Sequence, residues 1–331
     1  MKGHRWIMVG LLLLLFVSAS HLFAAPYYER KTMNIVVGFP PGGGYDKLAR
    51  LMAQFLPKYI PGKPTIVVQN MPGAAGIVAT NHVYNLPRQD GLTIGTFSNG
   101  VMRAQLAKEE GVRYDLGKFA WIGSAGGVNT LLAIRSDLPY KTYADLLNSK
   151  NPIYIGATEV GGTTTFSILL KEFLRVNFRI VKGYPGTPEV ILALERKEVD
   201  CIVSSYSTIK PLVDRGIARP MIRSRTFVPG LESVPVNEDL ATDKLGKTIM
   251  AIQCAMNESG RIYAAPPKTP PDVVGILRDA FAKVLNDPEV KDVGKKTMLE
   301  LDHISAEGLT KVIKYVFDQP EEILKEYRKY L

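Results

Sequence analysis

Two short glycine-containing segments carry the residues of this chain that are best suited to bind a ligand. The first, "FPPGGGYD", runs from Phe39 to Asp46, and the second, "PGAAG", runs from Pro72 to Gly76. Glycine permits positive φ angles and lets backbone N–H groups approach a bound group closely. A glycine loop that leads into a helix N-terminus therefore predicts a site for an anion such as a carboxylate.

The residues of the first loop have separate expected roles. We expect Gly42, Gly43 and Gly44 to allow positive φ and to bring their N–H groups close to the ligand. Asp46 would repel a bound carboxylate, so we expect it to cap loop N–H groups and to pair with Arg50, four residues on. Direct contact between Asp46 and an amine-bearing ligand is the alternative.

A third segment of the same kind, "EVGGTTT", follows a predicted strand in the middle of the chain. Its hydroxyl and N–H groups, those of Thr163 and Thr164 among them, could hold a second group of the ligand. One of these threonines could instead only cap the helix that follows.

The sequence offers little support for catalysis. The one string close to a P-loop, "ATDKLGKT", has Ala241 where the first glycine belongs, and no GxGxxG or GxSxG pattern is present. Beyond the N-terminal segment only His82 and His303 remain, far apart and without metal-ligand spacing. We therefore expect neither a cofactor nor a metal, and a protein that binds its ligand without reacting with it.

The elements that must position these loops alternate along the chain. Apolar β-branched runs followed by amphipathic segments predict parallel sheets wrapped by helices, with ligands at the carboxyl ends of the strands. The first helix is expected to start near Tyr45. The predicted strands are Asn34–Val37, Thr65–Gln69, Leu92–Phe97, Leu131–Ile134, Ile153–Ile155, Arg179–Val181 and Cys201–Ser204.

The first 25 residues form a separate segment with the pattern of a secretory signal. Lys2 and Arg5 precede a short apolar run, and a small-residue stretch follows, so we expect cleavage near Ala24 or Ala25 and a periplasmic protein. The formal net charge of +9 becomes +7 when Lys2 and Arg5 are lost. The basic residues are scattered, which argues against nucleic acid as a partner.

The chain has two cysteines, Cys201 and Cys254. Neither follows the signal, so no lipid anchor is expected. Whether the two form a disulfide in an oxidising compartment stays open from sequence alone.

The stretch "VVGFPPGGGYDKLARLMAQFLPKYIPGKPTIVVQNMPGAAGIVATNHVYNLPRQDGLTIG", with "GATEVGGTTTFSILLKEFL" and "IYAAPPKTPPDVVGILRDAFAKVLNDPEV", resembles the receptors of tripartite tricarboxylate transporters, the Bug-type solute-binding proteins. The resemblance implies an α/β, two-domain periplasmic binding protein of type II, a clam-shell with the ligand cleft between its domains. Residues 26–125 and 262–331 would form domain 1, and residues 126–261 domain 2. It also implies delivery of a small organic acid to one large and one small permease subunit in the inner membrane, by a monomer.

The resemblance further implies which residues face the ligand. The two glycine loops would hold one carboxylate, partly through water, and the loop after residue 158 and the strand end near residue 205 would face the ligand from domain 2. The resemblance carries over Phe39, Gly42, Gly43, Asp46, Gly73, Ala74, Ala75 and Thr163 as ligand-binding residues, and their loops add Tyr45 and Gly76. Placement at the ends of predicted strands adds Ser98, Thr158, Thr164, Ser205 and Tyr206 to the expected ligand-binding residues.

The chain also departs from the family pattern. "RKEVD" lacks the glycine usual before "VD", Phe166 lies near the usual histidine position, and residues 237–260 are atypical. These departures affect the far end of the ligand, which stays open among dicarboxylates, tricarboxylates, aromatic acids and acidic amino acids. Two other functions remain open: a ligand sensor for a membrane kinase, and a secreted α/β hydrolase acting on small organic acids.

Overall fold

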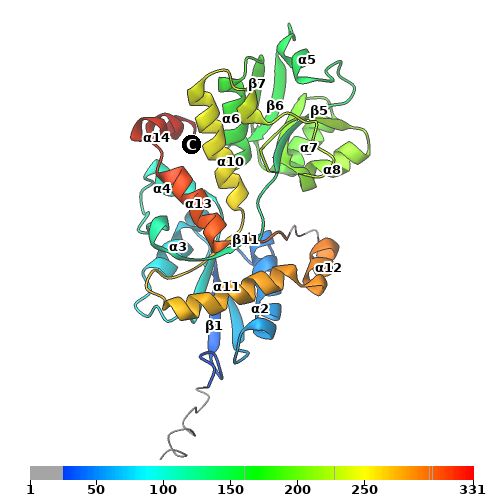
Figure 1. The fold of residues 1–331 in the computed structure, drawn as a ribbon. Helices are drawn as coiled ribbons and strands as arrows, with labels where there is room; N and C mark the ends of the chain where they lie inside the picture. The colour runs from blue at the N-terminus through cyan, green and yellow to red at the C-terminus, as the bar shows by residue number, and fades with distance from the viewer. Residues whose placement is uncertain (1–24, 160, 227, 298, 300) are drawn as a thin grey trace, which may run out of the picture.

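The computed structural model describes residues 25–159, 161–226, 228–297, 299 and 301–331, and in these the chain forms one β-sheet in each of two halves (Figure 1). Apart from residue 25, the predicted signal peptide lies outside the described residues. The first sheet has the order β11-β4-β10-β3-β1-β2, and the second the order β7-β6-β8-β5-β9. The strands are β1 Thr32–Val37, β2 Thr65–Asn70, β3 Thr93–Phe97, β4 Ala120–Ser124, β5 Thr130–Arg135, β6 Ile153–Thr158, β7 Phe178–Tyr184, β8 Cys201–Ser205, β9 Ala218–Arg223, β10 Ile262–Ala265 and β11 Ile304–Ser305.

Neither sheet is fully parallel, so that prediction is wrong in part. In the first sheet β1 is parallel to β2 and β3, but β10 is antiparallel to β3 and β4. In the second sheet β6 is parallel to β7 and β8, but β5 is antiparallel to β8 and β9. The reversal has a physical reason: the chain crosses between the sheets at their facing edges, so β5 and β10 enter from the edge where their parallel neighbours end.

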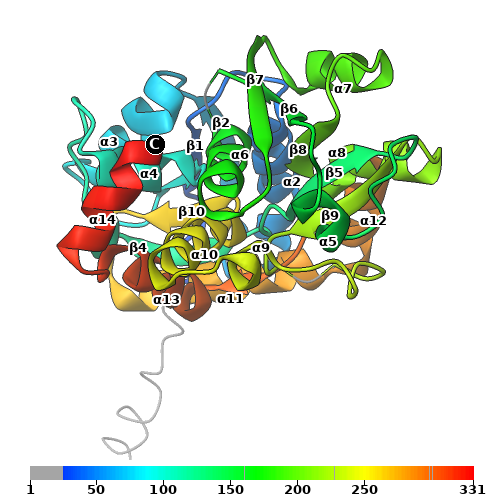
Figure 2. The same ribbon diagram turned by 90° about the horizontal axis from the view of Figure 1, so that it is seen from above.

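Helices cover both faces of each sheet. In the first half α2 and α11 pack on one face, and α3, α4 and α13 on the other; in the second half α6 and α10 pack opposite α7 and α8. Figure 2 shows the helices and strands of both halves from above. The helices are α2 Gly44–Tyr59, α3 Ile77–Tyr84, α4 Gly100–Ala107, α5 Tyr143–Leu147, α6 Gly162–Phe173, α7 Thr187–Glu195, α8 Tyr206–Asp214, α9 Asn237–Leu240, α10 Lys244–Ser259, α11 Pro271–Asn286, α12 Pro288–Thr297, α13 Ala306–Phe317 and α14 Glu321–Tyr327, with short 3-10 turns η1 Ala74–Gly76, η2 Leu116–Lys118 and η3 Arg328–Tyr330.

The amphipathic pattern read from the sequence explains why α2 forms where it does. Leu48, Leu51, Met52, Phe55 and Leu56 recur at helical spacing, and all are buried against the first sheet and α11. Full burial of each such side chain contributes about 1.5–3 kcal/mol. This burial fixes the helix axis, and with it the direction in which its N-terminus points.

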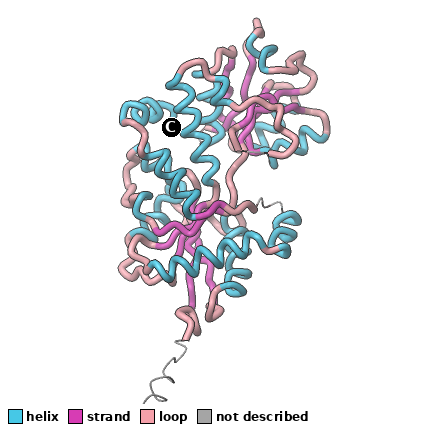
Figure 3. The backbone as a smooth tube through the Cα atoms, viewed as in Figure 1, coloured by secondary structure: helices cyan, strands magenta, loops and turns pink. Residues whose placement is uncertain are grey.

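Helix α10 joins the two halves. It packs against α6 of the second half and against α13 of the first, and one core cluster of buried side chains runs continuously through it (Figures 1 and 3). The boundaries proposed for the two domains, after residues 125 and 261, lie on either side of the second sheet and α10, and they stay a prediction.

The two cysteines are free and buried in this structure. Cys201 lies in β8 and Cys254 in α10. Among the helices that the structure describes, none is long and apolar enough to cross a membrane.

Candidate functional site

The two predicted glycine loops lie against each other at one edge of the first sheet. Strand β1 is the parallel neighbour of both β2 and β3, so the first glycine loop after Val37, the second after Asn70 and the loop after Phe97 all emerge at the same edge. A Cβ atom built on Gly38 would lie 3.0 Å from the Cα atom of Gly76, which shows that the backbones of the two loops are packed together. Ser98, directly after β3, lies at this edge as well.

Asp46 organises the first loop from within. Its buried carboxylate accepts a hydrogen bond from the Gly42 N–H at 2.8 Å, from Arg50 Nε at 2.9 Å and from Asn70 Nδ2 at 2.9 Å. The bond from Arg50, with those from Gly42 and Asn70, lowers the pKa of Asp46 to about 2. Asn70 also donates to the Phe39 carbonyl at 3.0 Å. The predicted capping and pairing of Asp46 are both present, and its carboxylate is engaged inside the protein.

The expected conformation of the three glycines is only partly found. Gly42 has a φ of 84°, but Gly43 has a φ of −75° and Gly44 already belongs to α2. Of the three glycines, Gly42 uses the positive φ that glycine allows, and α2 begins at Gly44, one residue before Tyr45. The Gly42 N–H is bound to Asp46, while Gly43 caps α2 without a side-chain hydrogen bond.

The second loop holds its backbone in an unusual conformation. Gly73, Ala74, Ala75 and Gly76 have consecutive positive φ angles of 147°, 44°, 52° and 100°. A left-handed conformation costs an alanine about 1–2 kcal/mol. Both alanines are exposed. Strain of this kind gathers at ligand-binding loops, and successive backbone N–H groups in such a turn form a concave anion site.

The aromatic residues of the first loop pack on each other. The rings of Phe39 and Tyr45 are stacked, with centroids 4.4 Å apart and an angle of 19° between their planes. Burial raises the pKa of Tyr45 to about 12, and the neighbouring Ser98 side chain acts in the opposite direction. Phe166, by contrast, is a core residue with 1% of its surface exposed.

The predicted threonines of the second half differ in their exposure to solvent. Strand β6 ends at Thr158, and Thr163 lies half-buried in the first turn of α6. Thr164 is buried and donates to the Thr158 carbonyl at 3.0 Å, with the two hydroxyl oxygens 3.1 Å apart. Thr164 thus closes the turn between β6 and α6, which leaves Thr163 as the one nearer the surface.

Ser205 and Tyr206 lie where β8 passes into α8. The Ser205 hydroxyl accepts from the Thr208 N–H at 3.3 Å and caps the helix. The Tyr206 N–H donates to the Asn129 carbonyl at 2.8 Å. Tyr206 also lines a cavity of about 610 Å³ together with Lys210 from α8 and, from the other half, Lys291 and Lys295 of α12. This strand end therefore faces the space between the two halves.

A buried amide, Asn257 of α10, connects the loops of both halves. Its Oδ1 accepts from Asn99 Nδ2 and from Gln253 Nε2, each at 3.1 Å, and its Nδ2 donates to Thr130 Oγ1 at 3.1 Å. A Cβ atom built on Gly162 would lie 3.6 Å from the Asn257 Oδ1. Asn257 thus joins the residue after Ser98, the start of β5 and the N-terminus of α6. The sequence reading missed it, although two amides four residues apart in a largely apolar helix were a usable signal.

Arg261 is a second residue that the sequence reading missed. Ile262 pairs with Phe97 across β10 and β3, so Arg261 lies beside Ser98 at the edge that carries the glycine loops. Alternation along the strand places its side chain on the same face as Tyr263. Its positive charge favours the ionised forms of Tyr45 and Tyr263 and so works against the effect of burial on their pKa values. The only sequence signal for Arg261 as a site residue was its position between a glycine and the first residue of a strand.

The edge therefore combines strained backbone N–H groups, hydroxyl groups and a guanidinium group, all of which suit an anion. No group of three or more metal-ligating side chains occurs among the described residues.

Comparisons with known proteins identify the family of this chain and proteins that resemble it. A family model described as "Tripartite tricarboxylate transporter family receptor" matches residues 48–328. A protein of Pseudomonas sp. strain P51, "UPF0065 protein in tcbD-tcbE intergenic region", is 23% identical over 98% of this chain and 95% of its own length.

Two solved structures share the fold. A TctC solute-binding protein from Polaromonas has a TM-score of 0.73 and 19% identity over 92% of this chain and 98% of that one. A protein of Rhodopseudomonas palustris, solved with adipate, has a TM-score of 0.62 and 22% identity over 90% of this chain and 97% of that one. The predicted two-domain periplasmic binding fold and the predicted family resemblance are both confirmed.

Proposed function

Because the chain belongs to the receptor family of the tripartite tricarboxylate transporters, we propose that it binds a small organic acid between its two halves. The observation that carries this proposal is the second glycine loop, in which four consecutive residues with positive φ lie against the first loop at the sheet edge. The family consists of solute-binding receptors, and the relative solved with adipate provides a carboxylate precedent for the fold.

In the proposed clasp, one carboxylate of the ligand accepts hydrogen bonds from backbone N–H groups of both loops. Those from Gly43 onward at the start of α2 and those of Ala74 and Ala75 are the expected donors, directly or through water. Each charge-assisted hydrogen bond contributes about 1.5–3 kcal/mol. Three or four, after the cost of ordering the ligand, are enough for a dissociation constant in the micromolar range, which corresponds to about 8 kcal/mol.

Side chains at the rim complete the proposed site. Phe39, Tyr45 and Ser98 form the wall on the first half, and Thr158, Thr163, Ser205 and Tyr206 face the ligand from the second. Arg261 adds a positive charge on the first half, beside Ser98. Gly42, Asp46 and Thr164 support the site from inside, since their polar groups are bound within the loops.

The proposal extends to the cellular role. The signal-like N-terminus and the family together support export to the periplasm, with cleavage near Ala24 or Ala25, and delivery of the bound acid by a monomer to the large and small permease subunits. The closure of the two halves over the ligand would give the permease a surface that distinguishes the loaded receptor from the empty one.

A binding screen tests the proposed function directly. Mature protein is heated with each of a panel of small organic acids, and each acid is paired with its neutral amide. An acid present at one hundred times its dissociation constant stabilises the folded protein by about 2.7 kcal/mol, which raises the melting temperature by a few degrees. We expect a shift with an acid and none with its amide. Equal shifts from the two members of every pair would exclude a carboxylate clasp.

A loop variant locates the binding in the cleft. A Cβ atom on Gly43 would meet only the Pro40 carbonyl, at 3.6 Å, so Gly43→Leu is compatible with folding and directs a bulky side chain to the loop surface. We expect it to abolish the acid-dependent shift. Gly275→Leu, on α11 with no atom within 4 Å of the added Cβ, is the matched control and should leave the shift unchanged.

A further inference from the structure

A second cavity, of about 310 Å³, lies against α10 on a different face from the acid site. Its α10 residues follow helical spacing, whereas Gln253 and Asn257 project from another part of the helix circumference. We call it the α10–α13 cavity. Its lining residues are Arg225, Glu238, Ala251, Cys254, Ala255, Glu258, Lys311, Val312 and Tyr315.

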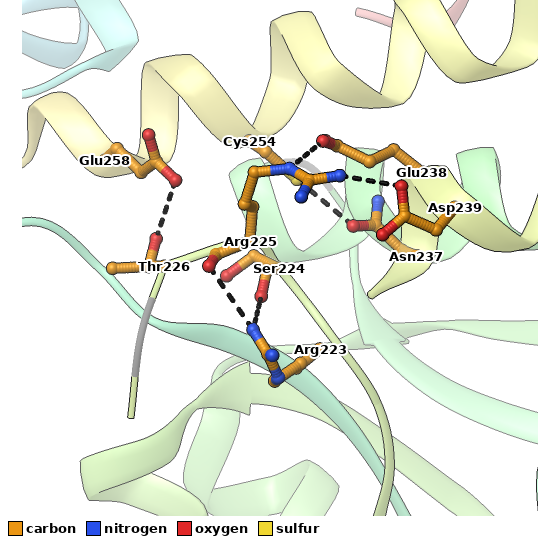
Figure 4. Close-up of polar contacts among 9 residues, drawn as sticks. All are labelled: Arg223, Ser224, Arg225, Thr226, Asn237, Glu238, Asp239, Cys254 and Glu258. Atoms are coloured by element: carbon orange, nitrogen blue, oxygen red, sulfur yellow. Dashed lines mark hydrogen bonds and ion pairs between the residues drawn. The ribbon is translucent and has the colours of Figure 1, made fainter. Parts of the chain in front are cut away.

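Glu238 gives this cavity a buried carboxylate of which only one oxygen accepts a hydrogen bond from the described residues. The residue is 8% exposed, and its Oε1 accepts a hydrogen bond from Arg225 Nε (Figure 4). Its Oε2 is buried and has no hydrogen-bond partner among the described residues. A buried, unpartnered carboxylate oxygen is costly, so a donor that enters the cavity gains a strong hydrogen bond there.

The charged residues that line the cavity are two glutamates, Glu238 and Glu258, and two cations, Arg225 and Lys311. Arg225 also donates to Asp239 Oδ1 at 2.7 Å, so its charge is shared between two carboxylates. Glu258 is half-buried, its carboxylate accepts one hydrogen bond from Thr226 Oγ1 at 3.2 Å, and burial raises its pKa (Figure 4). Arg225 thus engages one oxygen of Glu238 and Lys311 lies on the wall formed by α13, while Glu238 Oε2 on the wall formed by α9 and α10 is left as the acceptor without a hydrogen-bond partner among the described residues.

The thiol of Cys254, which also lines the cavity, adds no negative charge to it. Cys254 is 2% exposed and donates to Asn237 Oδ1 at 3.3 Å. Burial raises its pKa to about 12, so it remains a neutral thiol. Ala251, Ala255 and Val312 supply apolar surface beside the carboxylates.

We propose that the α10–α13 cavity binds a small organic cation through a primary ammonium group on a short aliphatic chain. An ammonium group has three donors, enough to reach Glu238 Oε2 and the Glu258 carboxylate together. The aliphatic chain lies along the two alanines and Val312. The site is separate from the acid site and does not depend on its function.

The test uses n-butylamine, which is protonated at pH 7, and butan-1-ol as its neutral counterpart of the same shape. Each is titrated at low ionic strength into the mature protein, and the backbone amide resonances of α9 and α10 are followed by NMR. We expect saturable shifts around Glu258 with the amine at millimolar concentrations, and none with the alcohol. Glu238→Gln, which keeps the shape of the side chain, should weaken the binding of the amine about tenfold or more.

Asp239→Asn is the matched control, because it also removes one partner of Arg225 but does not line the cavity. We expect this variant to change the affinity for the amine by less than about threefold, because solvent screens an exposed charge outside the cavity. Glu258→Gln serves as a second cavity variant that leaves the partners of Arg225 untouched.

Three results would overturn the proposal: no saturable response to the amine, an equal response to the alcohol, or equal weakening by the Asp239 variant and the two glutamate variants. The last result would indicate general attraction of cations to an acidic surface.

Discussion

The substitution Asp46→Asn tests the claim that a buried carboxylate holds the first glycine loop in place. Asparagine keeps the size of the side chain but removes the negative charge of the carboxylate. This carboxylate accepts hydrogen bonds from Gly42, Arg50 and Asn70. The variant therefore weakens charge-assisted hydrogen bonds without opening a cavity.

The magnitude follows from the pKa of Asp46, which falls from 3.8 to about 2 in the folded protein. Each unit of pKa corresponds to about 1.4 kcal/mol. Because the Arg50 side chain is 55% exposed, solvent screens part of this interaction. We expect the free energy of unfolding at pH 7 to fall by about 1–2 kcal/mol in the variant.

The sign of the pH dependence is fixed by the direction of the pKa shift. A carboxylate with a lowered folded-state pKa stabilises the protein above its unfolded-state pKa and loses that effect as the pH falls through the folded-state value. The difference between wild type and variant should thus be constant from pH 5 to 8 and fall to about half near pH 3.

Urea unfolding of both proteins at a series of pH values measures this difference. The double variant Asp46→Asn, Arg50→Gln completes a mutant cycle that isolates the pair from its neighbours. Equal stabilities at pH 7, or a difference that persists undiminished to pH 2, would refute the role assigned to Asp46.

Three further predictions concern the junction of the two halves. Gly260→Ala should destabilise the protein by about 3 kcal/mol or more in urea unfolding, since its Cβ would lie 1.6 Å from the Gly126 carbonyl oxygen at a φ of 59°; a stability within about 1 kcal/mol of wild type would contradict that packing. Asn257→Ala should lower the free energy of unfolding by about 2–3 kcal/mol, because Asn99, Gln253 and Thr130 each lose a partner; a loss no larger than that of Asn286→Ala, an exposed amide on α11, would show that the network is not important. Arg261→Gln should weaken binding of an acid identified in the screen about tenfold or more, as measured by calorimetry, whereas an unchanged affinity would remove Arg261 from the site.

Local sequence determined the loops and the elements beside them. The glycine content of residues 42–44 and 73–76, the position of Asp46 relative to Arg50, and the apolar spacing of α2 are all short-range features, and the structure contains the loop, the ion pair and the helix that they predict. Backbone sterics and hydrogen bonds between residues a few positions apart decide such features, so they can be read without knowing the rest of the fold.

Tertiary structure alone decided how these parts meet. The antiparallel course of β10, the approach of Gly38 to Gly76, and the contacts of Asn257 with residues more than one hundred positions away depend on packing between distant segments. The conformation of Gly43 also escaped the sequence reading, because glycine permits positive φ without requiring it. Arg261 belongs to the site only because β10 pairs with β3, and pairing between strands this far apart in sequence leaves no local pattern.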